Sequence, residues 1–116
     1  MTKPTLHVCT TCRAGLPLPE GETPMGRFLH SAVAAHPAAS AVDLREVTCL
    51  SLCDNGCAAA ISEPGKWSYL LGRLNPALAG DLLDYAASYA RSATGTVMPS
   101  RRAPSLARMI LGRVPA

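Results

Sequence analysis

The sequence lacks any hydrophobic run long enough to cross a membrane. Nowhere do about 18 apolar residues follow one another. Residues 1–6 contain Lys3 and Pro4 but no apolar stretch of the kind that forms a signal peptide. These absences predict a soluble, cytoplasmic protein that does not bind membranes.

Charged residues are also scarce, at 16% of the 116 residues, whereas 48% of the residues are apolar. A chain of this length and composition can form one compact domain but is too short for two independent cores. We therefore expect one domain at residues 1–92, followed by a C-terminal extension at residues 93–116.

The extension contains no acidic residue. It holds Arg101, Arg102, Arg108 and Arg113, so it carries a charge of +4, while the remaining residues hold seven bases against eight acids. The net charge of +3 at pH 7 is therefore concentrated in a basic tail. Because no aromatic residues are interleaved with these arginines, the tail does not indicate a nucleic-acid-binding protein.

The five cysteines are the most informative residues that are present. Cys9 and Cys12 follow a predicted strand, and Cys49, Cys53 and Cys57 share the stretch Cys-Leu-Ser-Leu-Cys-Asp-Asn-Gly-Cys. In a reducing cytoplasm, an odd number of clustered cysteines favours metal ligation or thiol redox chemistry over structural disulfides. The cysteines therefore predict a small metalloprotein.

The pattern of apolar residues predicts the order strand, helix, strand, strand, strand, helix. Strands are expected at residues 5–9, 42–47, 57–61 and 67–71. The pairs Thr23-Pro24 and Asn75-Pro76 are expected to begin the two helices, because threonine and asparagine are good N-caps and proline suits the first helical position. The result is an α/β fold with a mixed sheet.

Two further local features complete this prediction. Glu63-Pro64-Gly65-Lys66 predicts a type II turn between the last two strands. The basic C-terminal tail, with Gly95, Pro99 and Pro104, is expected to be irregular apart from one or two helical turns within residues 106–111.

The spacing of the cysteines bears on which metal they bind. Soft thiolate ligands suit zinc and iron-sulfur clusters alike. A zinc ribbon separates its two cysteine pairs by about 15–20 residues, whereas 36 residues lie between Cys12 and Cys49. Such a gap favours a 2Fe-2S cluster held between two loops of a βαβ unit, with Arg13 and the pair Asn55-Gly56 as candidates to offset its negative charge.

Two alternatives remain open on the residues alone. One is a zinc- or cobalt-binding module that delivers its metal to another protein. The other is a dithiol oxidoreductase that acts through Cys9 and Cys12, although about ten loop residues separate Cys12 from the helix N-terminus that would activate the thiol in a thioredoxin-type site.

The same features resemble the thioredoxin-like 2Fe-2S ferredoxins. The segment Cys49-Leu-Ser-Leu-Cys53, the Pro64-Gly65 turn and Trp67-Ser-Tyr69 are similar to the corresponding loop and hairpin of those ferredoxins and of the small iron-sulfur subunit of respiratory complex I. More narrowly, His7-Val-Cys9-Thr-Thr-Cys12-Arg13, Cys57 and Met98-Pro99-Ser-Arg-Arg resemble a bacterial family labelled "predicted metal-binding protein", which is often encoded near cobalamin-biosynthesis genes.

The resemblance implies a thioredoxin-like fold that carries one 2Fe-2S cluster as its cofactor. Its ligands would be Cys9, Cys12, Cys49 and Cys53, with Cys57 as an alternative to Cys12. It also implies a non-enzymatic electron carrier with a protein redox partner, a homodimeric assembly, and a link to cobalamin or cobalt metabolism.

Overall fold

A computed structural model describes residues 3–11, 21–48, 50, 57–98, 102, 104–106 and 108–115. Its helices and strands are β1 (Thr5–Cys9), α1 (Met25–Ala35), β2 (Asp43–Val47), β3 (Ala59–Ser62), β4 (Ser68–Leu71), α2 (Ala79–Arg91) and β5 (Ile110–Val114). Short 3-10 helices occupy Pro37–Ala41 (η1), Pro76–Leu78 (η3) and Pro104–Leu106 (η5). No helix within these described ranges is both long and apolar enough to span a membrane.

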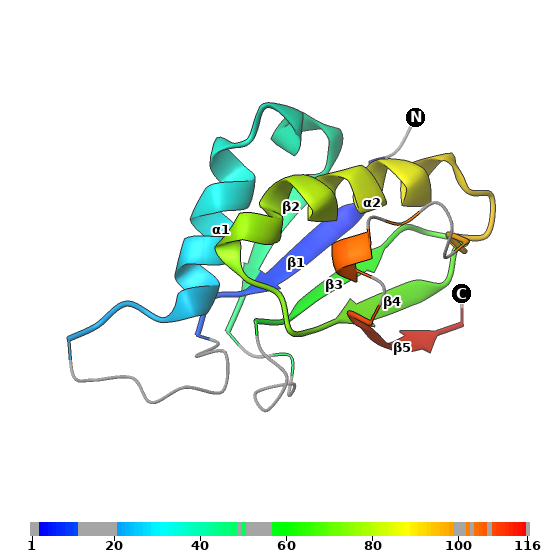
Figure 1. The fold of residues 1–116 in the computed structure, drawn as a ribbon. Helices are drawn as coiled ribbons and strands as arrows, with labels where there is room; N and C mark the ends of the chain where they lie inside the picture. Colours follow the sequence, from blue (N-terminus) through cyan, green and yellow to red (C-terminus); the bar gives the residue numbers. More distant parts are fainter. Residues whose placement is uncertain are drawn as a thin grey trace.

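The strands form one mixed sheet in the order β2-β1-β3-β4-β5. β1 and β2 are parallel, and each of the other neighbouring pairs is antiparallel. Both helices lie against the same face of this sheet (Figure 1). The structure therefore confirms the predicted α/β class with a mixed sheet.

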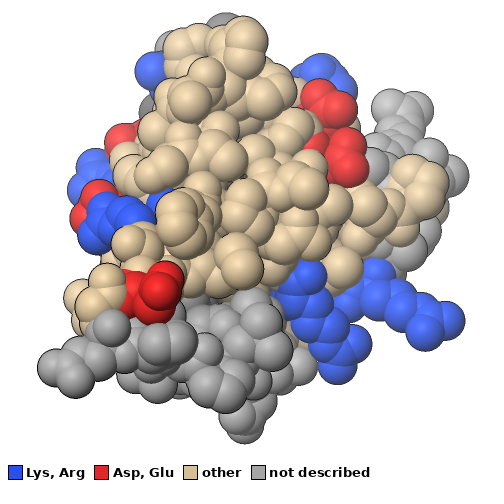
Figure 2. Space-filling model, turned by 60° about the vertical axis from the view of Figure 1, so that its left-hand side comes forward, with Lys and Arg blue, Asp and Glu red and all other residues tan. Residues whose placement is uncertain are grey.

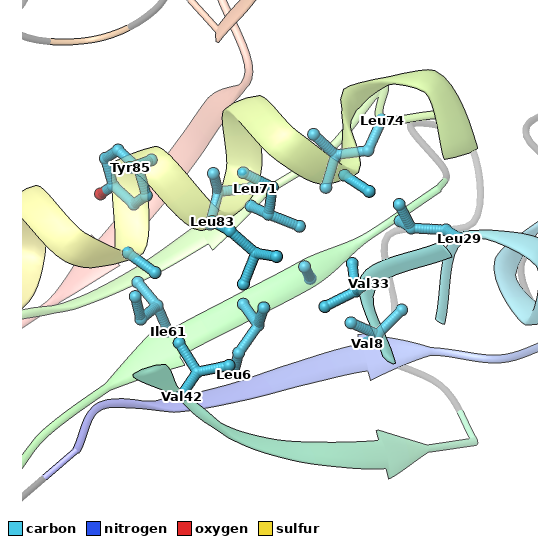
Figure 3. Close-up of a cluster of buried hydrophobic side chains, with 14 of the residues drawn as sticks. Leu6, Val8, Leu29, Val33, Val42, Ile61, Leu71, Leu74, Leu83 and Tyr85 are labelled. Atoms are coloured by element: carbon cyan, nitrogen blue, oxygen red, sulfur yellow. The ribbon is translucent and has the colours of Figure 1, made fainter. Parts of the chain in front are cut away.

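The core lies between the sheet and the two helices. Leu6 and Val8 alternate with the half-buried Thr5 and His7, as expected of a strand with one covered face. Figure 3 shows these two side chains pointing into a cluster that also contains residues of α1, β3, β4 and α2. The labelled members of this cluster are Leu6, Val8, Leu29, Val33, Val42, Ile61, Leu71, Leu74, Leu83 and Tyr85. Full burial of each large aliphatic side chain contributes about 1.5–3 kcal/mol.

The C-terminal tail differs from the sequence prediction, because it is not irregular throughout. Residues 110–114 form β5, which pairs antiparallel with β4 through Ser68↔Val114 and Leu71↔Ile110. The helical turn ends at Leu106, so the prediction of helical turns as far as residue 111 was wrong. The physical reason is that β4 would otherwise present an unpaired edge, and the tail satisfies its backbone groups.

The predicted helix starts were right in one case and wrong in the other. The Asn75 side chain accepts a hydrogen bond from the Ala77 amide at 2.9 Å, and the 3-10 turn that begins there continues into α2. At α1, the capping position belongs to Pro24 rather than Thr23, and no side-chain cap is formed. Pro24 has an extended ψ of 147°, which holds it outside the helix.

The β3–β4 hairpin is attached to the C-terminal end of α2. Gly65 has a φ of +83°, as the predicted type II turn requires at this position. Lys66 Nζ lies 2.8 Å from Glu63 Oε2 and donates hydrogen bonds to the carbonyls of Tyr89 and Ala90 at 3.1 and 3.0 Å. The partly buried ammonium group therefore neutralises Glu63 and also satisfies carbonyls at the helix end.

Gly95 is required where the chain leaves α2 and passes this hairpin. Its φ is +86°, and a Cβ atom added there would lie 2.8 Å from Tyr89 Cε2 and 2.9 Å from the Trp67 carbonyl oxygen. We expect Gly95→Ala to lower the free energy of unfolding by about 3 kcal/mol, because left-handed strain and overpacking add. Urea denaturation monitored by circular dichroism measures this loss.

Gly65→Ala is the matched control for this substitution. Gly65 has nearly the same φ, but nothing lies within 4 Å of an added Cβ atom. Its expected cost is therefore only the backbone term of about 1 kcal/mol. Equal losses in the two variants would show that the close contact at Gly95 has no energetic consequence.

Candidate metal centre

Three chain segments meet at one edge of the sheet. Because β1 and β2 are parallel and Cys9 pairs with Val47, both strands end at this edge. β3 is antiparallel to β1, so it begins where β1 ends. We call residues 9–11, 47–48 and 57–58 the cysteine edge; it lies at the lower left of the sheet in Figure 1. The edge brings together segments almost forty residues apart.

Cys9 is buried at the end of β1, with 1% of its surface exposed. Its amide donates to the Ala58 carbonyl at 3.0 Å. Its thiol donates to the Thr48 carbonyl at 3.4 Å, and the Thr11 hydroxyl donates to the same oxygen. Thr48, which precedes Cys49 in the chain, is therefore joined to the end of β1 by the side chains of Cys9 and Thr11.

Cys57 is fully buried immediately before β3. Its amide donates to the Leu74 carbonyl at 3.2 Å, and its carbonyl accepts from the Leu74 amide at 3.0 Å. The next residue, Ala58, carries the carbonyl that binds the Cys9 amide. Cys9 and Cys57 are thus neighbours across the β1–β3 pair, and both backbones are fixed by the sheet.

Burial raises the pKa of the Cys57 thiol to about 11, and the nearby Cys9 thiol adds to this increase. At neutral pH the thiol therefore keeps its proton unless a cation compensates the thiolate charge. A metal ion supplies that charge and displaces the proton. Cysteine sulfurs are ligands that suit iron-sulfur clusters, zinc and cobalt. This pair of buried sulfurs therefore fits a metal centre with thiolate ligands.

The structure brings Cys9 and Cys57 together, while the other predicted ligands, Cys12, Cys49 and Cys53, lie outside the described residues. Arg13, Asn55 and Gly56 lie outside them as well. Within the described part of the chain, no group of three or more His, Cys, Asp or Glu side chains is placed to hold a metal ion. The four-cysteine ligand set therefore stays a prediction.

Sequence reasoning did not identify Arg73. This residue precedes Leu74, which pairs with Cys57. Arg73 has a φ of +56°, the left-handed region that favours glycine. The sequence does not indicate a left-handed backbone at Arg73, because a positive φ would ordinarily be assigned to the adjacent Gly72. Only the register of the strands indicates the left-handed conformation of Arg73.

Comparison with known proteins agrees with the fold. A family model described as "Protein of unknown function (DUF1636)" matches residues 6–116. The structure is similar to the solved structure of a thioredoxin-like 2Fe-2S ferredoxin from Aquifex aeolicus, with a TM-score of 0.59 and 11% sequence identity over 97% of this chain and 94% of that one. No curated protein matches the sequence. The fold is therefore thioredoxin-like, as predicted.

The Thr11 hydroxyl provides a test of how the two cysteine segments are joined. We expect Thr11→Val to lower the free energy of unfolding by about 1 kcal/mol, because the Thr48 carbonyl loses its hydroxyl donor. Thr11→Ser keeps the hydroxyl and should cost less. Urea denaturation of the two variants measures the difference, and an equal loss in both would contradict a role for the hydrogen bond.

Proposed function

The chain belongs to the DUF1636 family, and we propose that it is an electron-transfer protein with one 2Fe-2S cluster at the cysteine edge. The observation that carries this proposal is the meeting of Cys9, Thr48 and Cys57 at one end of the sheet. The similar protein from Aquifex aeolicus is described as a 2Fe-2S ferredoxin, which supports the same type of centre on this fold.

We assign the cluster ligands to Cys9, Cys12, Cys49 and Cys53, with Cys57 as the alternative to Cys12. Chain connectivity supports this choice, because Thr48 leads directly into Cys49 and contacts Cys9. Cys57 qualifies as the alternative because it is the second buried cysteine beside Cys9. When bound, the cluster would take up and release one electron.

The burial of Cys9 disfavours the dithiol alternative. A reactive cysteine of the thioredoxin type is partly exposed and lies at a helix N-terminus, whereas Cys9 is 1% exposed at the end of a strand. A zinc- or cobalt-delivery module would use the same donors, so it differs from the proposal only in the metal that is bound. Metal analysis separates these two functions.

The rest of the proposal rests on the family resemblance. We propose a bacterial, cytoplasmic protein linked to cobalamin or cobalt metabolism, which exchanges electrons with a protein partner, binds neither nucleic acid nor membrane, and forms a homodimer. Residues 93–116 are proposed as an extension of the domain formed by residues 1–92.

Metal analysis of protein purified without oxygen tests the cofactor. We expect about two iron atoms and two acid-labile sulfides per chain, with visible charge-transfer absorption that is partly bleached on reduction and lost on chelation. About one zinc or cobalt without sulfide would instead establish a metal-delivery module. Reduction of insulin disulfides by metal-free protein would establish the dithiol oxidoreductase.

Cysteine substitutions test the ligand assignment. We expect Cys49→Ser and Cys53→Ser to abolish the visible absorption, because each removes a thiolate from an iron, whereas Cys57→Ser should retain it. Circular dichroism of each variant verifies the fold. Retention of the cluster in Cys12→Ser and its loss in Cys57→Ser would transfer the fourth ligand from Cys12 to Cys57.

A further inference from the structure

We propose that the chain has a second binding site, between α2 and the tail that follows it, for a small organic anion. The anionic group is a carboxylate or a phosphate, which accepts hydrogen bonds from Tyr85 and Arg102. The site lies towards the end of α2 that is attached to the β3–β4 hairpin, away from the cysteine edge. The proposal therefore goes beyond electron transfer and does not depend on it.

A cleft of about 510 Å³ lies between the C-terminal half of α2 and the residues that follow it. Its described lining consists of Ser88, Arg91, Ser92, Thr96, Val97 and Met98. This volume is within the range of pockets that bind small organic molecules. The lining offers three hydroxyl groups and one guanidinium group, and it includes no acid. Val97 and Met98 add an apolar wall, so the cleft suits a ligand with an anionic end and an apolar body.

The tail passes along the face of α2 that carries Tyr85. Four residues share this face because they follow one another at intervals of three or four: Asp81, Tyr85, Ser88 and Ser92. At one end of the face, the Ser105 hydroxyl donates to Asp81 Oδ2 at 2.6 Å. At the other end, the Ser92 hydroxyl accepts a hydrogen bond from the Gly95 amide at 3.0 Å. Tyr85 therefore lies between these two attachments, one helical turn from the lining of the cleft.

Tyr85 has a buried hydroxyl group that makes no hydrogen bond with the described residues. Only 2% of the residue is exposed, and Figure 3 shows the hydroxyl pointing towards the C-terminal end of α2, where the cleft lies. A buried hydroxyl without a partner destabilises the folded chain. Burial also raises the pKa of the Tyr85 phenol, so at neutral pH the hydroxyl keeps the proton that it can donate.

Arg102 supplies a second donor without a partner. Its Nε atom is buried and makes no hydrogen bond within the described part of the chain. The positive charge of Arg102 opposes the rise in the pKa of Tyr85, so the two groups lie near each other. Because Nε of an arginine donates and never accepts, an acceptor placed between these two groups would satisfy both.

The charges around the two donors favour an anion as that acceptor. Arg91 lines the cleft and Arg102 adjoins Tyr85, whereas Asp81 already accepts a hydrogen bond from the tail. Other parts of the surface are ion-paired, as in Arg27–Glu46, and Figure 2 shows basic and acidic side chains side by side at its left margin. A carboxylate or phosphate oxygen can accept two hydrogen bonds and carries the charge that an arginine attracts.

Both donor atoms are enclosed, so an anion reaches them by separating Arg102 from α2. This separation breaks no hydrogen bond at either atom, because neither atom makes one with the described residues. The anion adds two hydrogen bonds, and bonds to a charged group are stronger than bonds between neutral groups. The arrangement therefore favours an anion over the direct contact of Arg102 with α2.

Calorimetric titration of the full chain with three compounds that share a phenyl ring tests the site. Phenyl phosphate and benzoate carry an anionic group, whereas phenol is neutral. In a buffer without phosphate or carboxylate, we expect an anionic compound to bind, to raise the melting temperature, and to bind about tenfold more tightly than phenol. The tighter of the two anions identifies the acidic group of the ligand. Equal binding of phenol, or binding of neither anion, would overturn the proposal.

Substitutions show whether the anion binds at the two donors. Tyr85→Phe and Arg102→Gln each remove one donor, and each should weaken binding of the anion about tenfold. Arg45→Gln is the matched control, because it removes the same charge from an exposed residue of β2 that pairs with Asp43, and it should leave the affinity unchanged. Circular dichroism verifies the fold of each variant. Unchanged affinity in both donor variants, or an equal loss in Arg45→Gln, would contradict the assignment.

The stability of Tyr85→Phe without any added anion provides a separate readout. We expect its melting temperature to equal or exceed that of the wild type, because phenylalanine removes a buried hydroxyl that has no partner. A lower melting temperature would show that the hydroxyl is already hydrogen-bonded, for example to an enclosed water, and would also refute the proposal. These measurements do not use the candidate metal centre, so their outcome is independent of the proposed function.

Discussion

The parallel pairing of β1 with β2 is the constraint on which the candidate centre depends. Parallel strands require a crossover, which α1 provides, and the crossover returns the chain so that Val47 ends beside Cys9. Without this pairing, residues almost forty positions apart would have no reason to meet. A register shift of one residue would also turn Leu6 and Val8 out of the core, so burial of the core fixes the geometry of the cysteine edge.

Much of this arrangement was predictable from local patterns. The alternation around Leu6 and Val8 predicts a strand, and the Asn75-Pro76 pair predicts the start of a helix. In both segments the local sequence decides the structure. β5 was not predictable, because the sequence Ile-Leu-Gly-Arg-Val has no clear alternation and forms a strand only where β4 offers an edge. The left-handed backbone of Arg73 was missed for the same reason, since strand pairing imposes it.

The cysteine edge is built on the core. Cys9 and Cys57 both belong to the buried cluster, and their backbones bond to Ala58 and Leu74. In small zinc-dependent domains the metal itself supplies the folding energy, whereas here the sheet and two helices hold these two sulfurs in place by packing. A centre on such a scaffold would move little when its charge changes, which suits an electron carrier.

Left-handed backbone occurs at both ends of the sheet, but it has a different structural cause at each end. At the hairpin end, the positive φ values belong to Gly65 and Gly95, where a side chain would be strained or would collide with Tyr89. At the cysteine end, a positive φ belongs to Arg73, an exposed residue with a long charged side chain. Packing against Tyr89 and the Trp67 carbonyl explains the glycine at position 95, whereas the pairing of Leu71 with Ala59 and of Leu74 with Cys57 imposes the positive φ on Arg73.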